Sequence, residues 1–162
     1  MTPHVVYLAV SSGLKVGVTR AQTTLERWGD QGAVAAGVLA RTPDRLTAGQ
    51  IEHSLTAHLS DRTSWQKLLT GKIAEVDLKS ELTRVGGLLE EGHERFFSPG
   101  EEIARIDYPV TRFLEKAKSA NLLKIPEIEG EFLGIKGQYL LIGQKGFNVR
   151  RHSGFQVAFD VG

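Results

Sequence analysis

Four side chains in the first third of the chain have the types that phosphodiester hydrolysis requires. This reaction needs an activated water, a positive charge for the phosphoryl oxygens and help for the leaving oxygen. An arginine binds two phosphate oxygens through its planar fork, and a glutamate holds one hard divalent cation with waters completing the shell. A tyrosine accepts the proton of the water only where a neighbouring cation, such as a lysine, lowers its pKa. The candidate catalytic residues are therefore Tyr7, Lys15, Arg27 and Glu52.

The strands that must position Tyr7 and Lys15 are two apolar runs, VVYLAV and LKVGVT, separated by SSG. They predict a hairpin in which Tyr7 lies opposite Gly17. This register makes one face wholly apolar, whereas a slip by one residue would place polar side chains in the core. The other face then carries Tyr7, Lys15 and Thr19, and Gly17 leaves room for the Tyr7 ring. If Lys15 is buried, its amine is an alternative base.

Arg27 lies within residues 23–31, which predict a short helix with Thr23 or Thr24 as its cap. Residues 33–42 predict a third strand, although alanine and glycine pack weakly in a sheet. The fold class that follows is α+β, with a three-stranded antiparallel sheet flanked by helices.

Glu52 lies within residues 43–60, which predict a longer helix with Asp44 in the cap region and an apolar stripe toward the core. Arg45 and Glu52 fall on a neighbouring stripe, because residues seven positions apart nearly superpose on a helix. Arg45 therefore either pairs with Glu52 or reaches a phosphate.

Each candidate also has a purely structural interpretation. Tyr7 is equally consistent with a structural role as a half-buried core tyrosine, and Lys15 with that of a solvated strand residue. Arg27 and Glu52 are explained as well by an ion pair between two helices. The sequence leaves these alternatives open.

The composition changes after the first hundred residues, so we expect a domain over residues 1–103 and a small β-rich module over residues 104–162. In the module, residues 111–120 predict a helix. Three glycine-punctuated runs, EFLGIKGQYLLIG, GFNVRRH and GFQVAFDV, predict a small antiparallel sheet or barrel. Two further short helices are predicted before the module, from SWQKLL and DLKSELTRVGGLLEE.

The module also carries basic residues that are candidates for contacts with nucleic acid. Alternation along FNVRRH would give one strand a polar and basic face, with Lys136 in a neighbouring strand or turn. The alternative is a solvated edge whose charges prevent association. With the candidates from the first domain, the predicted nucleic-acid contacts are Thr19, Arg20, Arg45, Lys136, Arg150 and Arg151.

The order of Tyr7, Lys15, Arg27 and Glu52 resembles the GIY-YIG nuclease superfamily over about the first third of the chain. VVY corresponds to the GIY motif and KVG to the YIG motif. Lys15 stands where the pattern has its second tyrosine, although a lysine also occurs there in some branches of the superfamily. The resemblance implies a metal-dependent endonuclease, with Glu52 as the ligand of one Mg²⁺ or Mn²⁺ ion and with DNA or RNA as the partner.

A second resemblance extends over almost the whole chain. HVVYLA, LKVGVTR, RWGDQGA, RLTAGQIE, GIKGQYLL and FNVRRHSGF are similar to the bacterial family catalogued as domain of unknown function 2797. Its members usually carry a cysteine-rich segment, expected to bind zinc, upstream of the HVVYLA strand. The resemblance therefore implies that this chain is either a short natural variant or a truncated protein.

Composition limits the possible partners and the compartment. The 162 residues include 20 basic and 19 acidic ones, so the net charge of +1 does not suit a protein that coats nucleic acid by charge alone. No cysteine is present, which excludes disulfides and thiolate-bound zinc within this sequence. No apolar run is long enough to cross a bilayer and no signal peptide is evident, so we expect a cytoplasmic protein without a membrane partner.

Three functions remain in view. The first is a GIY-YIG-like metal-dependent endonuclease, which the combination of Tyr7, Arg27 and Glu52 favours. The second is a nucleic-acid-binding module on the same fold with weak or absent catalysis, which Lys15 and the near-zero net charge favour. The third is a protein-interaction domain, which salt-dependent binding of DNA or RNA would exclude.

Overall fold

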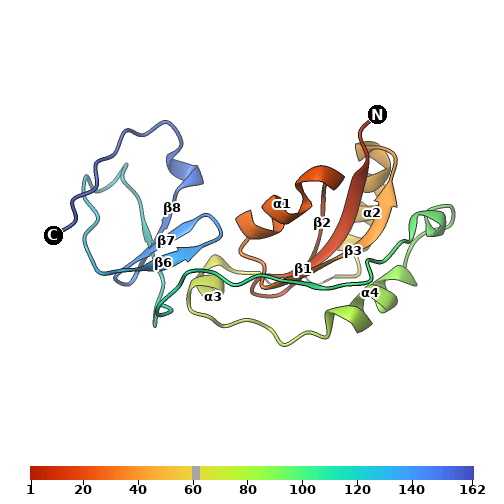
Figure 1. Cartoon of the computed structure of the whole chain (residues 1–162), viewed down its shortest axis with the longest axis horizontal. Helices are drawn as coiled ribbons and strands as arrows, with labels where there is room; N and C mark the ends of the chain where they lie inside the picture. The colour runs from red at the N-terminus through yellow and green to blue at the C-terminus, as the bar shows by residue number, and fades with distance from the viewer. Residues whose placement is uncertain (60–62) are drawn as a thin grey trace.

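The computed structural model describes residues 1–59 and 63–162, which form two four-stranded sheets joined by extended segments (Figure 1). The first sheet has the strand order β2-β1-β3-β4 and the second has the order β5-β8-β7-β6. The strands of the first sheet are β1 (His4–Val10), β2 (Leu14–Arg20), β3 (Ala35–Thr42) and β4 (Ala104–Arg105). The strands of the second are β5 (Lys118–Ala120), β6 (Phe132–Lys136), β7 (Tyr139–Ile142) and β8 (Lys145–Asn148). The α-helices are α1 (Thr24–Asp30), α2 (Arg45–Thr56), α3 (Trp65–Leu69) and α4 (Leu78–Gly86).

The β1–β2 hairpin has the predicted register. Val10 pairs with Leu14 and Tyr7 pairs with Gly17. The apolar face of the hairpin packs into a core with α2 and α4, whereas the Tyr7 face packs against Trp28 of α1. Helices therefore cover both faces of the first sheet (Figure 1). The alternation of apolar and polar residues was sufficient to predict this register because each face packs against a different layer.

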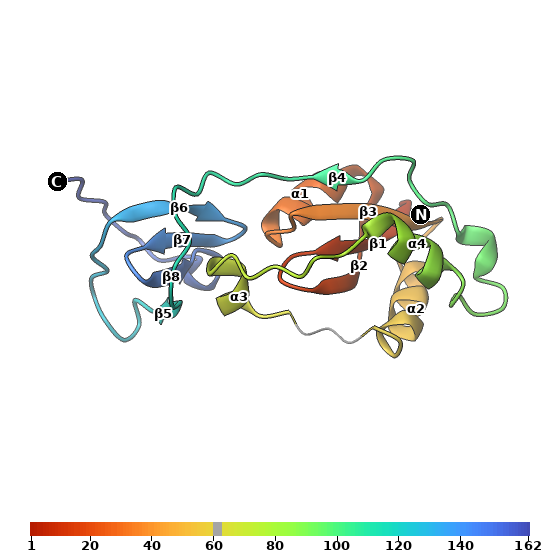
Figure 2. The ribbon, with the colours of Figure 1, turned by 90° about the horizontal axis from the view of Figure 1, so that it is seen from below.

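The prediction of a three-stranded first sheet is wrong, because β4 adds a fourth strand beside β3. Its two residues pair with Ala35 and Ala36. Backbone bonds from Ser98 N to Leu39 O, 3.0 Å, and from Gly100 N to Val38 O, 3.1 Å, continue along the same edge. Figure 2 shows this segment lying beside β3 and then running to the second sheet. A two-residue strand has no periodicity of its own, so no local pattern of residues indicates it.

The two helices that carry Arg27 and Glu52 form where they were expected. The side chain of Asp44 accepts a hydrogen bond from Thr47 N at 2.8 Å, which confirms the predicted cap of α2. This helix ends at Thr56, earlier than predicted, and Ser60 at the predicted end lies outside the described residues.

The second module differs from its prediction in two places. The predicted helix over residues 111–120 is wrong: this segment is irregular with several bends and ends in β5, with Leu114 N bonded to Leu69 O at 3.0 Å. GFNVRRH is a strand only as far as Asn148, and GFQVAFDV forms no strand with the described residues. A 3-10 helix, Arg150–His152, follows β8 because the ring of His152 turns back to Asn148 O at 2.7 Å.

The short helix α3 lies beside the second sheet although α2 and α4, its neighbours in the sequence, cover the first (Figure 2). Leu69 packs with Leu114, Leu133 and Leu141 in a third apolar cluster. Helix α3 thus packs with the second sheet, although it lies between α2 and α4 in the sequence. No helix in the described part of the chain is long and apolar enough to cross a membrane.

Candidate functional site

Tyr7 lies at the centre of the candidate site, on the face of the first sheet that α1 covers. Its side chain is fully buried, and its ring meets Trp28 edge to face with the ring centroids 5.8 Å apart. The ring crosses β2 directly above Gly17, where an added Cβ would lie 2.5 Å from the Tyr7 hydroxyl. The absence of a side chain at Gly17 therefore allows the hydroxyl to reach across the edge strand.

Gln31 connects Tyr7 with Arg27. The Gln31 side-chain amide lies 2.9 Å from the Tyr7 hydroxyl. With its carbonyl turned toward Arg27, it accepts hydrogen bonds from Arg27 Nε at 3.2 Å and Nη2 at 3.3 Å, and its amide nitrogen donates to the Tyr7 oxygen. This orientation satisfies all three side chains, because a guanidinium can only donate. Gln31 thus fixes the Tyr7 hydroxyl and the Arg27 guanidinium relative to each other.

The electrostatics of Tyr7 show which charges surround its hydroxyl. Burial raises the pKa of Tyr7 above its ordinary value, the charge and hydrogen bonding of Arg27 lower it, and the charge of Glu52 raises it. Burial has the largest effect, so the neutral phenol is favoured in this structure. Residues from β1, α1 and α2 therefore act on one another at this point, although they are far apart in the sequence.

Glu52 faces the same site from α2. It is half-buried, and burial raises the pKa of its carboxyl, while the charges of Arg45 and Arg27 lower it. Within the described residues no ion pair joins Glu52 to either arginine, so the interpretation of Arg27 and Glu52 as a directly bonded structural pair is not supported. The two guanidinium groups are instead available for an anionic ligand beside Glu52.

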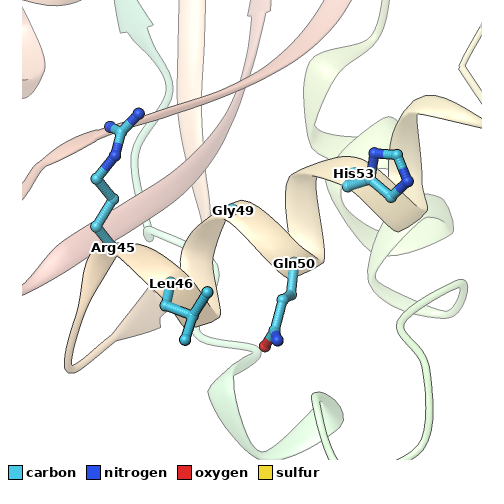
Figure 3. A pocket seen from close by; sticks show the side chains of 5 residues that line it. All are labelled: Arg45, Leu46, Gly49, Gln50 and His53. Atoms are coloured by element: carbon cyan, nitrogen blue, oxygen red, sulfur yellow. The ribbon is translucent and has the colours of Figure 1, made fainter.

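Two shallow depressions meet at Arg45. One, of about 740 Å³, is lined by residues of β2, α1 and the start of α2. Its polar lining residues include Thr19, Arg20, Arg27 and Arg45. The other, of about 620 Å³, follows α2 over Leu46, Gly49, Gln50 and His53 (Figure 3). Arg45 points away from Leu46 and Gln50 in this view, toward the ribbons of the sheet. The surface next to the buried Tyr7 is thus open and basic.

The other predicted site residues lie in different settings. Lys15 is half-buried on the Tyr7 face of β2, where it pairs with Ala9. Thr19 exchanges a hydrogen bond with Thr23 at 3.2 Å, and Arg20 is exposed at the end of β2. The candidates of the first domain therefore lie on β1, β2, α1 and α2, around the β2 edge of the first sheet.

The candidates of the second module are separate from this site. Lys136 is 1 % exposed and its Nζ lies over two aromatic rings, so it is not on an exposed face of the module, where a phosphate contact was predicted. Local alternation could not show this, because Tyr108 and Phe113 that cover it come from another segment. Arg150 and Arg151 are exposed, on a 3-10 helix rather than on the predicted strand face.

Gln31 is a residue of this site that was not among the candidates predicted from the sequence. Its signal was its position four residues after Arg27, which places the two side chains on one side of α1 where the helix ends. Its partner Tyr7 is 24 positions away, so the hydrogen bond itself depends on the tertiary fold.

The described residues contain no group of three or more histidine, cysteine, aspartate or glutamate side chains that could hold a metal ion together. A divalent cation at this site would have Glu52 as its protein ligand and waters or substrate oxygens as its others. The half-buried Glu52 carboxylate fits such a single-ligand site. Phosphate oxygens would offset the charges of the neighbouring arginines.

The fold and the site define an α+β protein with mainly antiparallel sheets and a basic depression beside a buried tyrosine. The chain belongs to the family described as protein of unknown function DUF2797, whose model matches residues 1–157. No curated protein and no solved structure matches the chain. The family assignment thus agrees with the second resemblance seen in the sequence, and any statement about activity has to come from the site.

Proposed function

We propose that the chain is a GIY-YIG-like metal-dependent endonuclease that acts on nucleic-acid phosphodiesters. The observation that carries the proposal is that Tyr7, Arg27 and Glu52 converge at the β2 edge. Gly17 has no side chain at this point, so the Tyr7 hydroxyl reaches across the strand. These residues lie on three different elements, and a basic depression adjoins them. A core tyrosine and two surface charges have no structural need for this arrangement.

Each side chain then has a definite part in the reaction. Arg27 and Arg45 bind phosphate oxygens and neutralise the charge that develops on the phosphoryl group. Tyr7 in its ionised form accepts a hydrogen bond from the attacking water and takes its proton; the Arg27 charge favours this phenolate, whereas burial opposes it. Gln31 keeps the Tyr7 hydroxyl oriented toward the water. A divalent cation held by Glu52 would polarise the phosphoryl oxygen and stabilise the leaving oxygen.

The alternative is a nucleic-acid-binding module on the same fold that cuts weakly or not at all. Two observations favour it: Lys15 replaces the second tyrosine of the pattern, and burial raises the pKa of Tyr7. A phenol with a raised pKa is a poor base at neutral pH. In this alternative Arg27 and Arg45 retain their phosphate contacts, and the exposed Arg150 and Arg151 of the second module add affinity.

The test is cleavage of labelled single-stranded and double-stranded DNA and RNA, with Mg²⁺ or Mn²⁺, by the wild type and by Glu52→Ala. We expect cleavage by the wild type alone. Because Glu52 is half-buried and has no direct ion pair with Arg27 or Arg45, we expect the thermal unfolding midpoint of the variant to stay close to that of the wild type.

Two outcomes contradict the endonuclease. Equal cleavage by both proteins would assign the activity to a contaminant or to another site. The absence of cleavage from folded wild-type protein, together with salt-dependent binding of the same substrates, would select the binding module. Binding weakened by the double variant Arg150→Ala and Arg151→Ala would show that the second module contributes affinity.

A further inference from the structure

Tyr108 connects the second module to the end of the helix that carries Arg27. Its hydroxyl donates to Ala33 O at 2.8 Å and also lies 3.3 Å from Gly29 O and 3.5 Å from Trp28 O. Gly29 and Ala33 are two residues before and two residues after Gln31. The Tyr108 hydroxyl therefore holds both sides of the turn from which the Gln31 side chain reaches Tyr7.

The turn after β6 contacts the same turn from a second direction. A Cβ built on Gly137 would lie 2.9 Å from Gly32 N and 3.0 Å from Asp30 O. Gly137 also has φ of +59°, a conformation that glycine adopts without cost. The close approach of two backbones, which only glycine permits here, shows that the β6–β7 turn is fitted against the end of α1.

The Tyr108 ring is held in its place by residues of its own module. Lys136 Nζ lies 5.5 Å from the centroid of the Tyr108 ring and 4.9 Å from that of Phe113. Because Lys136 is almost completely buried, it is a fixed part of this contact and not a mobile surface lysine. Lys136, Phe113 and the β6–β7 turn thus form a rigid support for the Tyr108 hydroxyl.

We propose that Tyr108 is a positioning residue, through which the second module holds the α1–β3 turn so that Gln31 orients the Tyr7 hydroxyl toward Arg27. The role of this orientation in catalysis rests on the proposed function, but the positioning itself does not. The connection runs through contacts of known length: Tyr108 to the turn carbonyls, Gln31 to Tyr7, and Gln31 to Arg27. The second module is then part of the site and not only a source of affinity.

The experiment uses the whole chain labelled with ¹³C at the tyrosine ring carbon that bears the hydroxyl. The sequence has three tyrosines, so three resonances report Tyr7, Tyr108 and Tyr139. Tyr108→Phe removes the hydroxyl that bonds the turn. Tyr139→Phe is the matched control, because it removes a hydroxyl from the same module at a ring that stacks on Trp65 of α3.

We expect Tyr108→Phe to shift the Tyr7 resonance and to move its titration down toward the ordinary tyrosine range, as the loosened turn admits water. Tyr139→Phe should leave the Tyr7 resonance and its titration unchanged. In a protein that already carries Gln31→Ala, adding Tyr108→Phe should not shift the Tyr7 resonance further. An unchanged Tyr7 resonance in folded Tyr108→Phe overturns the proposal. If that variant does not fold, Gly137→Ala, which pushes the turns apart, must shift the Tyr7 resonance instead.

Cleavage provides a second measurement where the endonuclease is active. Tyr108→Phe should lower the rate at saturating substrate by about 10- to 100-fold, while the Kd for nucleic acid stays within about twofold. A merely structural role would change stability without this separation of rate from affinity. If no protein cleaves at all, the proposed function fails, and the Tyr7 resonance still decides whether Tyr108 positions the site.

Discussion

The hydroxyl of Tyr7 lies directly over Gly17, so the ring of this core residue crosses the edge strand at a position without a side chain. An added Cβ at Gly17 would lie 2.5 Å from the hydroxyl oxygen and 2.6 Å from Cζ. Tyr7 is itself fully buried. The polar end of a core residue can thus meet charged groups from α1 and α2 without its ring leaving the core.

The first prediction concerns this contact. Gly17→Ala should displace the Tyr7 ring and lower the free energy of unfolding by about 1–3 kcal/mol, because the site is already filled. The measurement is denaturant unfolding of the wild type and the variant. Gly49→Ala is the control, since its Cβ would meet no atom within 4 Å and alanine favours a helix interior. Equal stability of Gly17→Ala and the wild type would show that Tyr7 is free to move.

The second prediction concerns the fork of Arg27. Arg27→Lys keeps the charge but loses the paired donors, so the affinity for nucleic acid should fall even though the net charge is the same. Fluorescence anisotropy over a range of salt concentrations measures this. Arg84→Lys, at an exposed arginine paired with Glu81 on α4, is the control for a loss of affinity unrelated to the site. Equal affinities of the two variants for nucleic acid would show that Arg27 does not belong to the phosphate site.

The third prediction concerns alkaline pH. Burial, with the charge of Asp30, raises the pKa of Tyr108 to about 12. A tyrosine in the unfolded chain has a pKa of about 10. Between this pKa and that of the folded state, the unfolded state has lost the proton that the folded state keeps. The free energy of unfolding should therefore fall as the pH rises through this range. In Tyr108→Phe the fall should be smaller, and an equal fall in both proteins would contradict the assignment.

The fourth prediction concerns the buried Lys136. Burial lowers the pKa of this amine, so the charged form is less favoured in the folded state than in the unfolded chain, and the charge costs stability at neutral pH. Lys136→Met should keep or raise the thermal unfolding midpoint at neutral pH. The difference between the midpoints of the variant and the wild type should shrink as the pH rises toward about 10.4, the ordinary pKa of lysine, because the amine then loses its charge in both states. Calorimetry at several pH values tests this.

The same variant tests whether Lys136 contacts nucleic acid. Because the side chain is almost completely buried, Lys136→Met should leave the affinity unchanged. Arg150→Ala, at an exposed position of the same module, is the comparison. A larger loss of affinity in Lys136→Met than in Arg150→Ala would show that the lysine becomes accessible on binding.

The sequence predicted those parts of the fold that depend on short-range patterns. The β1–β2 register followed from one wholly apolar face, and the start of α2 followed from Asp44. The pairing of Tyr7 with Gly17 was visible for the same reason, because hairpin neighbours are fixed by the length of the turn.

The remaining features depend on contacts between distant segments. β4 is a strand only because β3 lies beside it, and the segment before β5 forms no helix, with Leu114 N bonded to Leu69 O of α3 instead. No local pattern of residues indicates that Lys136 is buried, because the two rings over it belong to residues at least 23 positions earlier in the chain. Periodicity within a single segment cannot predict such pairings.

The most direct test of the central claim is single-turnover cleavage by the wild type and Glu52→Gln, with Glu81→Gln as the control for removing a carboxylate elsewhere. Glutamine keeps the shape of the side chain but loses the charge that would hold a divalent cation. The account predicts Mn²⁺- or Mg²⁺-dependent cleavage by the wild type and Glu81→Gln and at least a 100-fold lower rate for Glu52→Gln, on the order expected for a lost catalytic group. Equal rates for Glu52→Gln and the wild type would contradict a catalytic site at the β2 edge.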